Sequence, residues 1–197
     1  MKRTLLFVLL QAIVSSLALG RVTVAQSADH SSTAVAISSR ATPLLLEKDE
    51  GETWTRRPRP VPTPASQITL MVPHSNGSEH LVLGTETLAI NGTVPTHKHL
   101  GQDEILLINT GAVHASVGDQ ERDLHAGGLI FVPADTWVGL RNISAEAVGI
   151  TFIFSAPGFD QYVRCTSVPA NEKPTPMTQE EWQRCQHDAN AVFRQAP

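Results

Sequence analysis

The chain has 197 residues, enough for one domain of ordinary size with segments to spare at both ends. Hydrophobic residues make up 41%, which is enough for a core, and thirteen prolines and thirteen glycines indicate many turns. The net charge is -4, and the sequence has no basic run and no interleaving of aromatic with basic residues. Nucleic-acid binding therefore has no support.

Residues 1–25 have the pattern of a secretory signal. Two basic residues precede an apolar stretch, 5–19, that is too short and too polar to span a bilayer well. An uncleaved membrane anchor is the alternative. Cleavage could follow Gly20 or Ala25, and the polar stretch after Ala25 favours the second. Removal of residues 1–25 would take away three basic residues and no acidic one, leaving a net charge of -7. We expect a secreted or periplasmic protein.

The chain contains two cysteines, Cys165 and Cys185, and both follow the predicted signal. Export implies an oxidising compartment and an even count permits one disulfide, so we expect them to pair instead of remaining free thiols. The bridge would close a loop of about twenty residues, worth on the order of 3 kcal/mol in the chain-entropy model. The spacing fits no redox or zinc motif, so we expect a structural role.

Two segments lack the pattern of a helix or an interior strand. Residues 26–43 are rich in Ser, Ala and Thr, which is typical of a flexible N-terminal arm. Residues 56–64 contain too many prolines for an interior element. The arginines of this second segment, Arg56, Arg57 and Arg59, could form an anion site, but we favour a solvated, extended loop.

From residue 67 to residue 154, short apolar runs alternate with turn residues. The candidate strands are 68–72, 80–83, 85–90, 104–109, 112–117, 129–132, 138–142 and 148–154. Dipeptides typical of hairpin turns occur at Asn76-Gly77, Asn91-Gly92 and Gly118-Asp119. So many short strands predict an all-β sandwich or barrel.

A short helix is predicted near the C-terminus. Thr178 and Glu181 have the spacing of a capping box, in which each side chain bonds the other residue's backbone amide. Apolar residues then recur every three to four positions, at Trp182, Cys185, Ala189 and Val192. This stripe, with the expected disulfide, would hold the helix against the barrel.

The most informative pattern is His97-Lys98-His99 followed by Glu104. Two histidines at positions i and i+2 of a strand point to the same face, and the turn 100–102 can bring Glu104 to face them. Two neutral imidazoles and one carboxylate are the ligands of facial-triad iron sites, and they also suit zinc and manganese. The sequence therefore predicts a metal pocket without naming its reaction.

The segment 91–111 resembles the first motif of the cupin family. Four residues stand at the motif's His, His, Glu and second Gly positions: His97, His99, Glu104 and Gly111. The leading glycine is one place off, at Gly92. The neighbouring Asp103 could compete with Glu104, but the seven-residue step to Gly111 selects Glu104 as the ligand.

The segment 127–142 resembles the second cupin motif, with Gly127, Pro133 and Asn142 at the expected positions. Two positions depart from it. Asp135 replaces a glycine, and Val138 replaces the histidine that normally supplies a fourth ligand. Valine cannot coordinate a metal. The departure therefore leaves either an open coordination position or a degenerate site, and retention of three ligands in register favours the first.

The resemblance implies a double-stranded β-helix, or jelly roll, over residues 44–160, with the metal near the barrel centre and frequent homodimers. Residues 161–197 would then be an extension that carries the helix. The implied cofactor is one divalent metal ion, Fe, Mn, Ni or Zn. We expect a small-molecule ligand near Val138, with Trp137 as core or pocket wall and Gln102 within reach of a bound water.

Two hypotheses about function follow. The first is a metal-dependent, dioxygenase-like enzyme acting on a small organic substrate at the position that Val138 leaves open. The second is a non-catalytic cupin that binds a small ligand or serves as an accessory module. The apolar pair Trp137-Val138 supports the second, and the His97, His99 and Glu104 set supports the first.

Overall fold

The computed structural model describes residues 41–48, 50–60 and 66–194. The predicted signal at 1–25 and most of the predicted arm at 26–43 lie outside the described residues. Among those that are described, no helix has the length and apolar character needed to cross a membrane.

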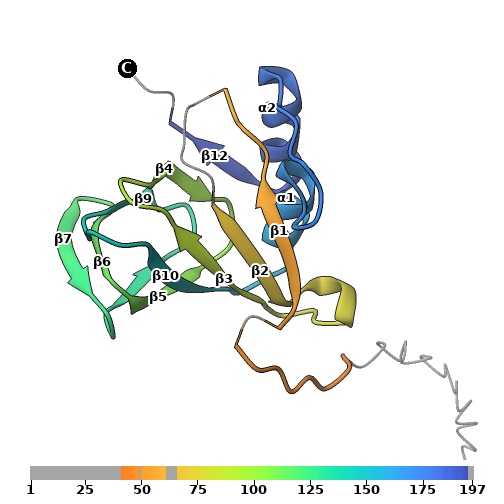
Figure 1. The fold of residues 1–197 in the computed structure, drawn as a ribbon, viewed down its shortest axis with the longest axis horizontal. Helices are drawn as coiled ribbons and strands as arrows, with labels where there is room; N and C mark the ends of the chain where they lie inside the picture. Colours follow the sequence, from red (N-terminus) through yellow and green to blue (C-terminus); the bar gives the residue numbers. More distant parts are fainter. Residues whose placement is uncertain (1–40, 49, 61–65, 195–197) are drawn as a thin grey trace, which may run out of the picture. The chain divides into compact units, whose positions relative to one another are not determined.

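Two antiparallel sheets make up the fold (Figure 1). Across the larger sheet the strands are β11 (Ser167–Pro169), β1 (Glu52–Arg56), β2 (Gln67–Val72), β3 (Val82–Leu88), β10 (Val148–Phe154), β5 (Glu104–Thr110) and β8 (Leu129–Val132). Across the smaller sheet they are β12 (Ala191–Phe193), β4 (Thr93–His99), β9 (Val138–Asn142), β6 (Ala112–Val117) and β7 (Gln120–His125). A 3-10 turn, η1 (His74–Asn76), and two helices, α1 (Phe159–Thr166) and α2 (Gln179–Asp188), complete the described elements.

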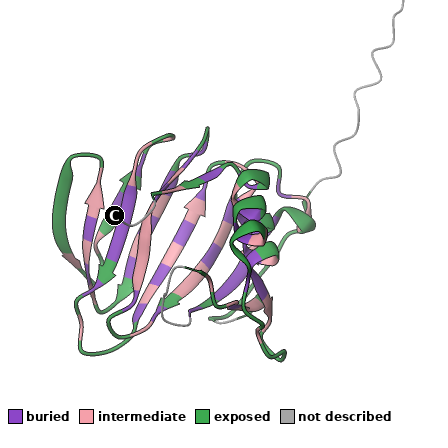
Figure 2. Cartoon of the chain, turned by 90° about the horizontal axis from the view of Figure 1, so that it is seen from above, coloured by how far each residue is buried: buried purple, intermediate pink, exposed green. Residues whose placement is uncertain are grey.

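The core lies between the inner faces of the sheets. Buried residues alternate with less buried ones along the strands, as the banding in Figure 2 shows, because successive side chains of a strand point to opposite faces. In β10, which lies between β3 and β5, the buried residues are Val148, Ile150, Phe152 and Phe154. The sequence pattern placed these four side chains on one face, and the structure confirms it.

One strand replaces two predicted ones. The candidates 80–83 and 85–90 are wrong, because β3 runs continuously through Gly84. A Cβ added at Gly84 would lie 2.5 Å from the ring of Phe152 and 2.4 Å from the carbonyl oxygen of Thr69. The glycine therefore allows a close approach of the neighbouring strands instead of ending the strand.

The hairpin dipeptides behave differently from one another. Gly118 and Asp119 join β6 to β7, with Val117 paired to Gln120, as predicted. Asn91-Gly92 does not form a hairpin, because β3 and β4 belong to different sheets. Asp135, which stands where the second motif has a glycine, adopts the left-handed conformation that glycine favours, with φ 63°.

The C-terminal segment joins both layers. The capping box of α2 is present, with the Glu181 amide donating to Thr178 Oγ1 at 3.1 Å. Cys165 in α1 and Cys185 in α2 form a disulfide with a Cα–Cα distance of 5.7 Å. Val192 does not continue the helical stripe, because it lies in β12, where Phe193 pairs with His97. The helix α1 was not predicted.

Removing the disulfide is expected to lower the free energy of unfolding by about 3 kcal/mol, because the bridge closes a loop between residues 20 apart in the chain. Urea denaturation of Cys165→Ala/Cys185→Ala beside the wild type measures the loss. Reductant should lower the wild-type midpoint and leave the double variant unchanged. Equal midpoints for the oxidised wild type and the double variant would contradict the stabilising role.

Candidate metal centre

The three predicted ligands come together from both sheets. His97 and His99 lie on β4 with Lys98 between them on the other face, and Glu104 is the first residue of β5. The ligand atoms of His97, His99 and Glu104 all lie within 4.8 Å of one another, and all three residues are buried. The short connection between the strands passes through Gly101 at φ 72° and turns the chain from one sheet to the other.

Hydrogen bonding leaves the ligand atoms available. His97 Nδ1 lies 2.8 Å from the carbonyl oxygen of Pro95, which favours a proton on Nδ1 and leaves Nε2 as the ligand. Both ring nitrogens of His99 and Oε2 of Glu104 are buried without a hydrogen-bond partner among the described residues. Buried polar atoms are almost always satisfied, so this cluster of orphaned atoms fits a bound cation.

Burial sets the protonation of the cluster. It lowers the pKa of His97 to about 4, and it lowers the pKa of His99 to about 2 with a smaller contribution from His97. Burial, together with the charge of Glu86, raises the pKa of Glu104 to about 8. Both imidazoles are therefore neutral at pH 7, the state in which they bind metals. Glu104 keeps its proton until a cation displaces it.

Aromatic rings fix the two imidazoles. Phe193 stacks on His97 with ring centroids 5.1 Å apart, and Phe154 meets the ring of His99 edge-on at 4.6 Å. Phe159 lies 5.8 Å from His99. These packed rings hold the ligands in position and keep water away from one side of the site.

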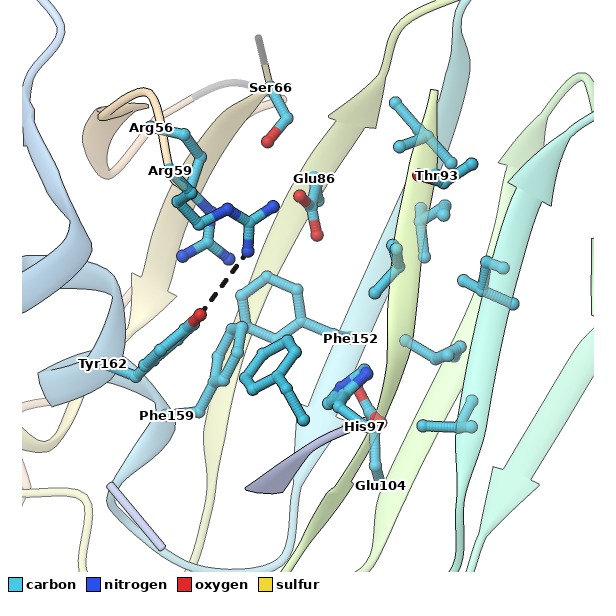
Figure 3. A pocket seen from close by; sticks show the side chains of 17 residues that line it. Arg56, Arg59, Ser66, Glu86, Thr93, His97, Glu104, Phe152, Phe159 and Tyr162 are labelled. Carbon is cyan, nitrogen blue, oxygen red and sulfur yellow. Dashed lines mark hydrogen bonds between the residues drawn. The ribbon is translucent and has the colours of Figure 1, made fainter. Parts of the chain in front are cut away.

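A cavity of about 40 Å³ adjoins the cluster. His97, Glu104 and Val138 line it near the predicted metal position, and apolar side chains such as Phe152 form its walls. Figure 3 shows Arg56, Arg59, Glu86 and Tyr162 on the opposite side of these walls from His97 and Glu104. The cavity therefore has the candidate metal ligands at one end, the two arginines at the other, and apolar walls between them.

The predicted substrate-binding residues divide into two groups. Val138 is buried at 1% exposure, lines the cavity and pairs with His97 across β9 and β4. Trp137 and Gln102 are not among the lining residues. Trp137 faces away, because it precedes Val138 and its ring contacts Lys98 and the guanidinium of Arg194 on the outer face. A pocket wall at Trp137 is therefore wrong.

Gln102 is buried. Its Nε2 donates to the carbonyl oxygen of Pro157 at 2.5 Å, which ties the turn between β4 and β5 to the segment before α1. The competing carboxylate, Asp103, is exposed and accepts a hydrogen bond from the Ala134 amide. Asp103 therefore lies outside the ligand set.

Sequence reasoning misjudged the arginine segment. Arg56 is buried at 8% exposure at the end of β1, and Arg59 also lines the cavity, so the predicted solvated loop is wrong at these positions. Residues 61–65 of that segment lie outside the described residues. The one sequence signal for this part of the site was the arginine cluster itself, for which an anion site was the alternative interpretation.

Residues 84–154 match the family model described as a cupin domain. This part of the chain is a cupin domain. The cupin fold is also that of a predicted oxalate decarboxylase from Thermotoga maritima, which is 13% identical with a TM-score of 0.52 over 57% of this chain and 99% of that one. The two-sheet structure and this likeness confirm the predicted jelly roll.

Two further structures are similar to this chain. KdgF from Halomonas sp. is 17% identical, with a TM-score of 0.49 over 60% of this chain and 99% of that one. An RmlC-like cupin from Shewanella frigidimarina NCIMB 400 is 14% identical, with a TM-score of 0.48 over 61% and 96%. A comparison with curated proteins gave no significant match.

Proposed function

We propose that this protein is an exported cupin that holds one divalent transition metal through His97, His99 and Glu104 and acts on a small organic substrate in a dioxygenase-like reaction. The observation that carries the proposal is the set of three buried ligand atoms within 4.8 Å of one another. Two imidazoles and one carboxylate suit Fe, Mn, Ni and Zn.

The residues around the cluster support binding and orientation of a substrate. When bound, the metal would act as a Lewis acid toward a substrate oxygen. Val138 has no donor atom, so it would leave the metal a position open to substrate. The aromatic walls, including Phe152 and Phe159, exclude water and orient an apolar part of the substrate.

A non-catalytic cupin is the second candidate. The missing fourth ligand at Val138 and the small cavity favour it, since both restrict what can bind and react.

Two further proposals concern the whole molecule. The Cys165–Cys185 disulfide supports export to an oxidising compartment. The half-exposed Leu129 and Phe131, on the edge strand β8, support a homodimer.

Elemental analysis of the protein, purified without chelator from its exported fraction, is expected to find about one equivalent of a transition metal. His97→Ala should lose that metal and keep the fold. His114→Ala is the matched control, because His114 lies on β6 and pairs with Asp123 at 2.7 Å away from the cluster. No metal in the wild type after reconstitution with Fe, Mn, Ni and Zn would overturn the metal site. A metal-loaded protein that consumes no oxygen with any small organic substrate would favour the non-catalytic candidate.

A further inference from the structure

Two guanidinium groups reach the cavity from outside the matched cupin segment. Arg56 is the last residue of β1, which pairs with β2 and β11 at one side of the larger sheet. Arg59 lies three residues further along the chain, and its Nη1 is 3.5 Å from the Tyr162 hydroxyl. Both guanidinium groups face the cavity in Figure 3.

Arg56 is a buried cation that the described residues leave incompletely paired. Its Nη1 donates to Thr166 Oγ1 at 2.7 Å, and its guanidinium lies 5.1 Å from the ring centroid of Tyr162. Its Nε is buried without a hydrogen-bond partner, and no carboxylate of the described residues forms an ion pair with it. Buried charges are normally paired, since desolvation is costly. This arrangement therefore has room for an anion.

The charges around the polar end favour a single negative charge. Arg56 and Arg59 bring two positive charges, and Glu86, which also lines the cavity, brings one negative charge. The formal charges of these three lining side chains sum to one positive charge, which matches a monoanion and disfavours a dianion next to Glu86. A planar carboxylate also fits the fork of donors that a guanidinium presents.

The space between the two ends is apolar. Leu106, Ile150, Phe152 and Phe159 are among the apolar residues that line the cavity. Figure 3 shows Phe152 and Phe159 between the arginines and His97. The centre of a water-sized sphere can reach about 40 Å³ of this cavity, which restricts the occupant to a small molecule. A molecule that fits both ends has a carboxylate, a short apolar middle and an oxygen that can reach the metal.

We propose that the cavity recognises a small monocarboxylate, whose carboxylate group is bound by Arg56 and Arg59 while its other end faces His97 and Glu104. The inference rests on the proposed function for the role of the second end. The anion subsite itself depends on the arginines and needs no metal. Arg56 and Arg59 are then the residues that select the class of substrate.

The test is a ligand-detected NMR titration of the full exported chain, both freed of metal with a chelator and loaded with Zn²⁺. The probes are acetate, butanoate and benzoate, each beside its neutral amide of nearly the same shape, and inorganic phosphate as a second anion. We expect at least one carboxylate to bind to the metal-free protein about tenfold or more tightly than its amide. Phosphate is expected to bind more weakly than that carboxylate.

Two variants assign the binding to the arginines. Arg56→Gln and Arg59→Gln should each weaken carboxylate binding about tenfold or more, while Arg122→Gln, an exposed position on β7, should match the wild type. Arg59 is only half-buried, so we expect Arg59→Gln to fold. It therefore still tests the proposal if Arg56→Gln unfolds. Equal affinity for carboxylates and amides, tighter binding of phosphate, or wild-type affinity in Arg59→Gln would overturn the proposal. Because the titration includes the metal-free protein, it tests the anion subsite even if the protein is found to bind no metal.

Discussion

The affinity of the candidate metal centre for Zn²⁺ is expected to rise about tenfold for each pH unit between about pH 5 and pH 8, and to level off above pH 8. The pKa of Glu104 is raised to about 8, mainly by burial, so this carboxyl is protonated over most of the range. Burial lowers the pKa of His97 to about 4 and that of His99 to about 2, so neither imidazole carries a proton to release. Each bound ion therefore displaces one proton, and a lower proton concentration favours binding.

Titration calorimetry at pH 7 in two buffers of different ionisation enthalpy counts this proton directly, and the same titration from pH 5 to pH 8 gives the slope. The gain over the range is about a thousandfold in affinity, or about 4 kcal/mol. Glu104→Gln is the control, because its amide oxygen replaces the carboxylate but has no proton to lose. It should bind Zn²⁺ more weakly and with no rise over this range. A wild-type affinity that is flat from pH 5 to pH 8 would show that metal binding displaces no proton from Glu104.

The ligand cluster could be predicted because its geometry is local. His97, His99 and Glu104 lie within one strand, one turn and the start of the next strand. The two-residue alternation of a strand is enough to bring the histidines to one face. The jelly roll was predictable for a related reason, since short alternating runs such as β10 report which face is buried.

The rest of the site depends on contacts between distant segments, which periodicity does not report. Arg56 reaches the cavity because β1 pairs with β2 and β11 at the edge of the larger sheet. Phe193 stacks on His97 because β12 pairs with β4 from the far end of the chain. The proline-rich segment 56–64 was also predicted to be solvent-exposed. Its composition excludes an interior helix or strand but does not show whether other parts of the chain bury it. Gly84 shows the same limit, because a glycine inside a strand resembles a turn until its neighbour Phe152 is seen.

Val138→His is expected to bind Zn²⁺ about tenfold or more tightly than the wild type, a gain of about 1.4 kcal/mol or more. Val138 pairs with His97 across β9 and β4, and its side chain lines the same cavity as His97 and Glu104. An imidazole at this position adds a fourth ligand to the cluster and completes a tetrahedral set. Competition with a chelator measures the difference in affinity.

Val138→Phe is the matched control, since it adds a similar ring without a ligand atom. Both variants enlarge a side chain that is 1% exposed, so both should destabilise the metal-free protein by about 1–3 kcal/mol. Only Val138→His should recover stability on addition of Zn²⁺ beyond the gain of the wild type. Equal Zn²⁺ affinity in the two variants would show that Val138 does not stand at the fourth ligand position.

If the protein is an enzyme that uses the open position, Val138→His should also hold its metal more tightly and turn over more slowly. A non-catalytic cupin would show no turnover in either protein, so comparing the wild type with Val138→His tests the role of the open position only if the wild type is active.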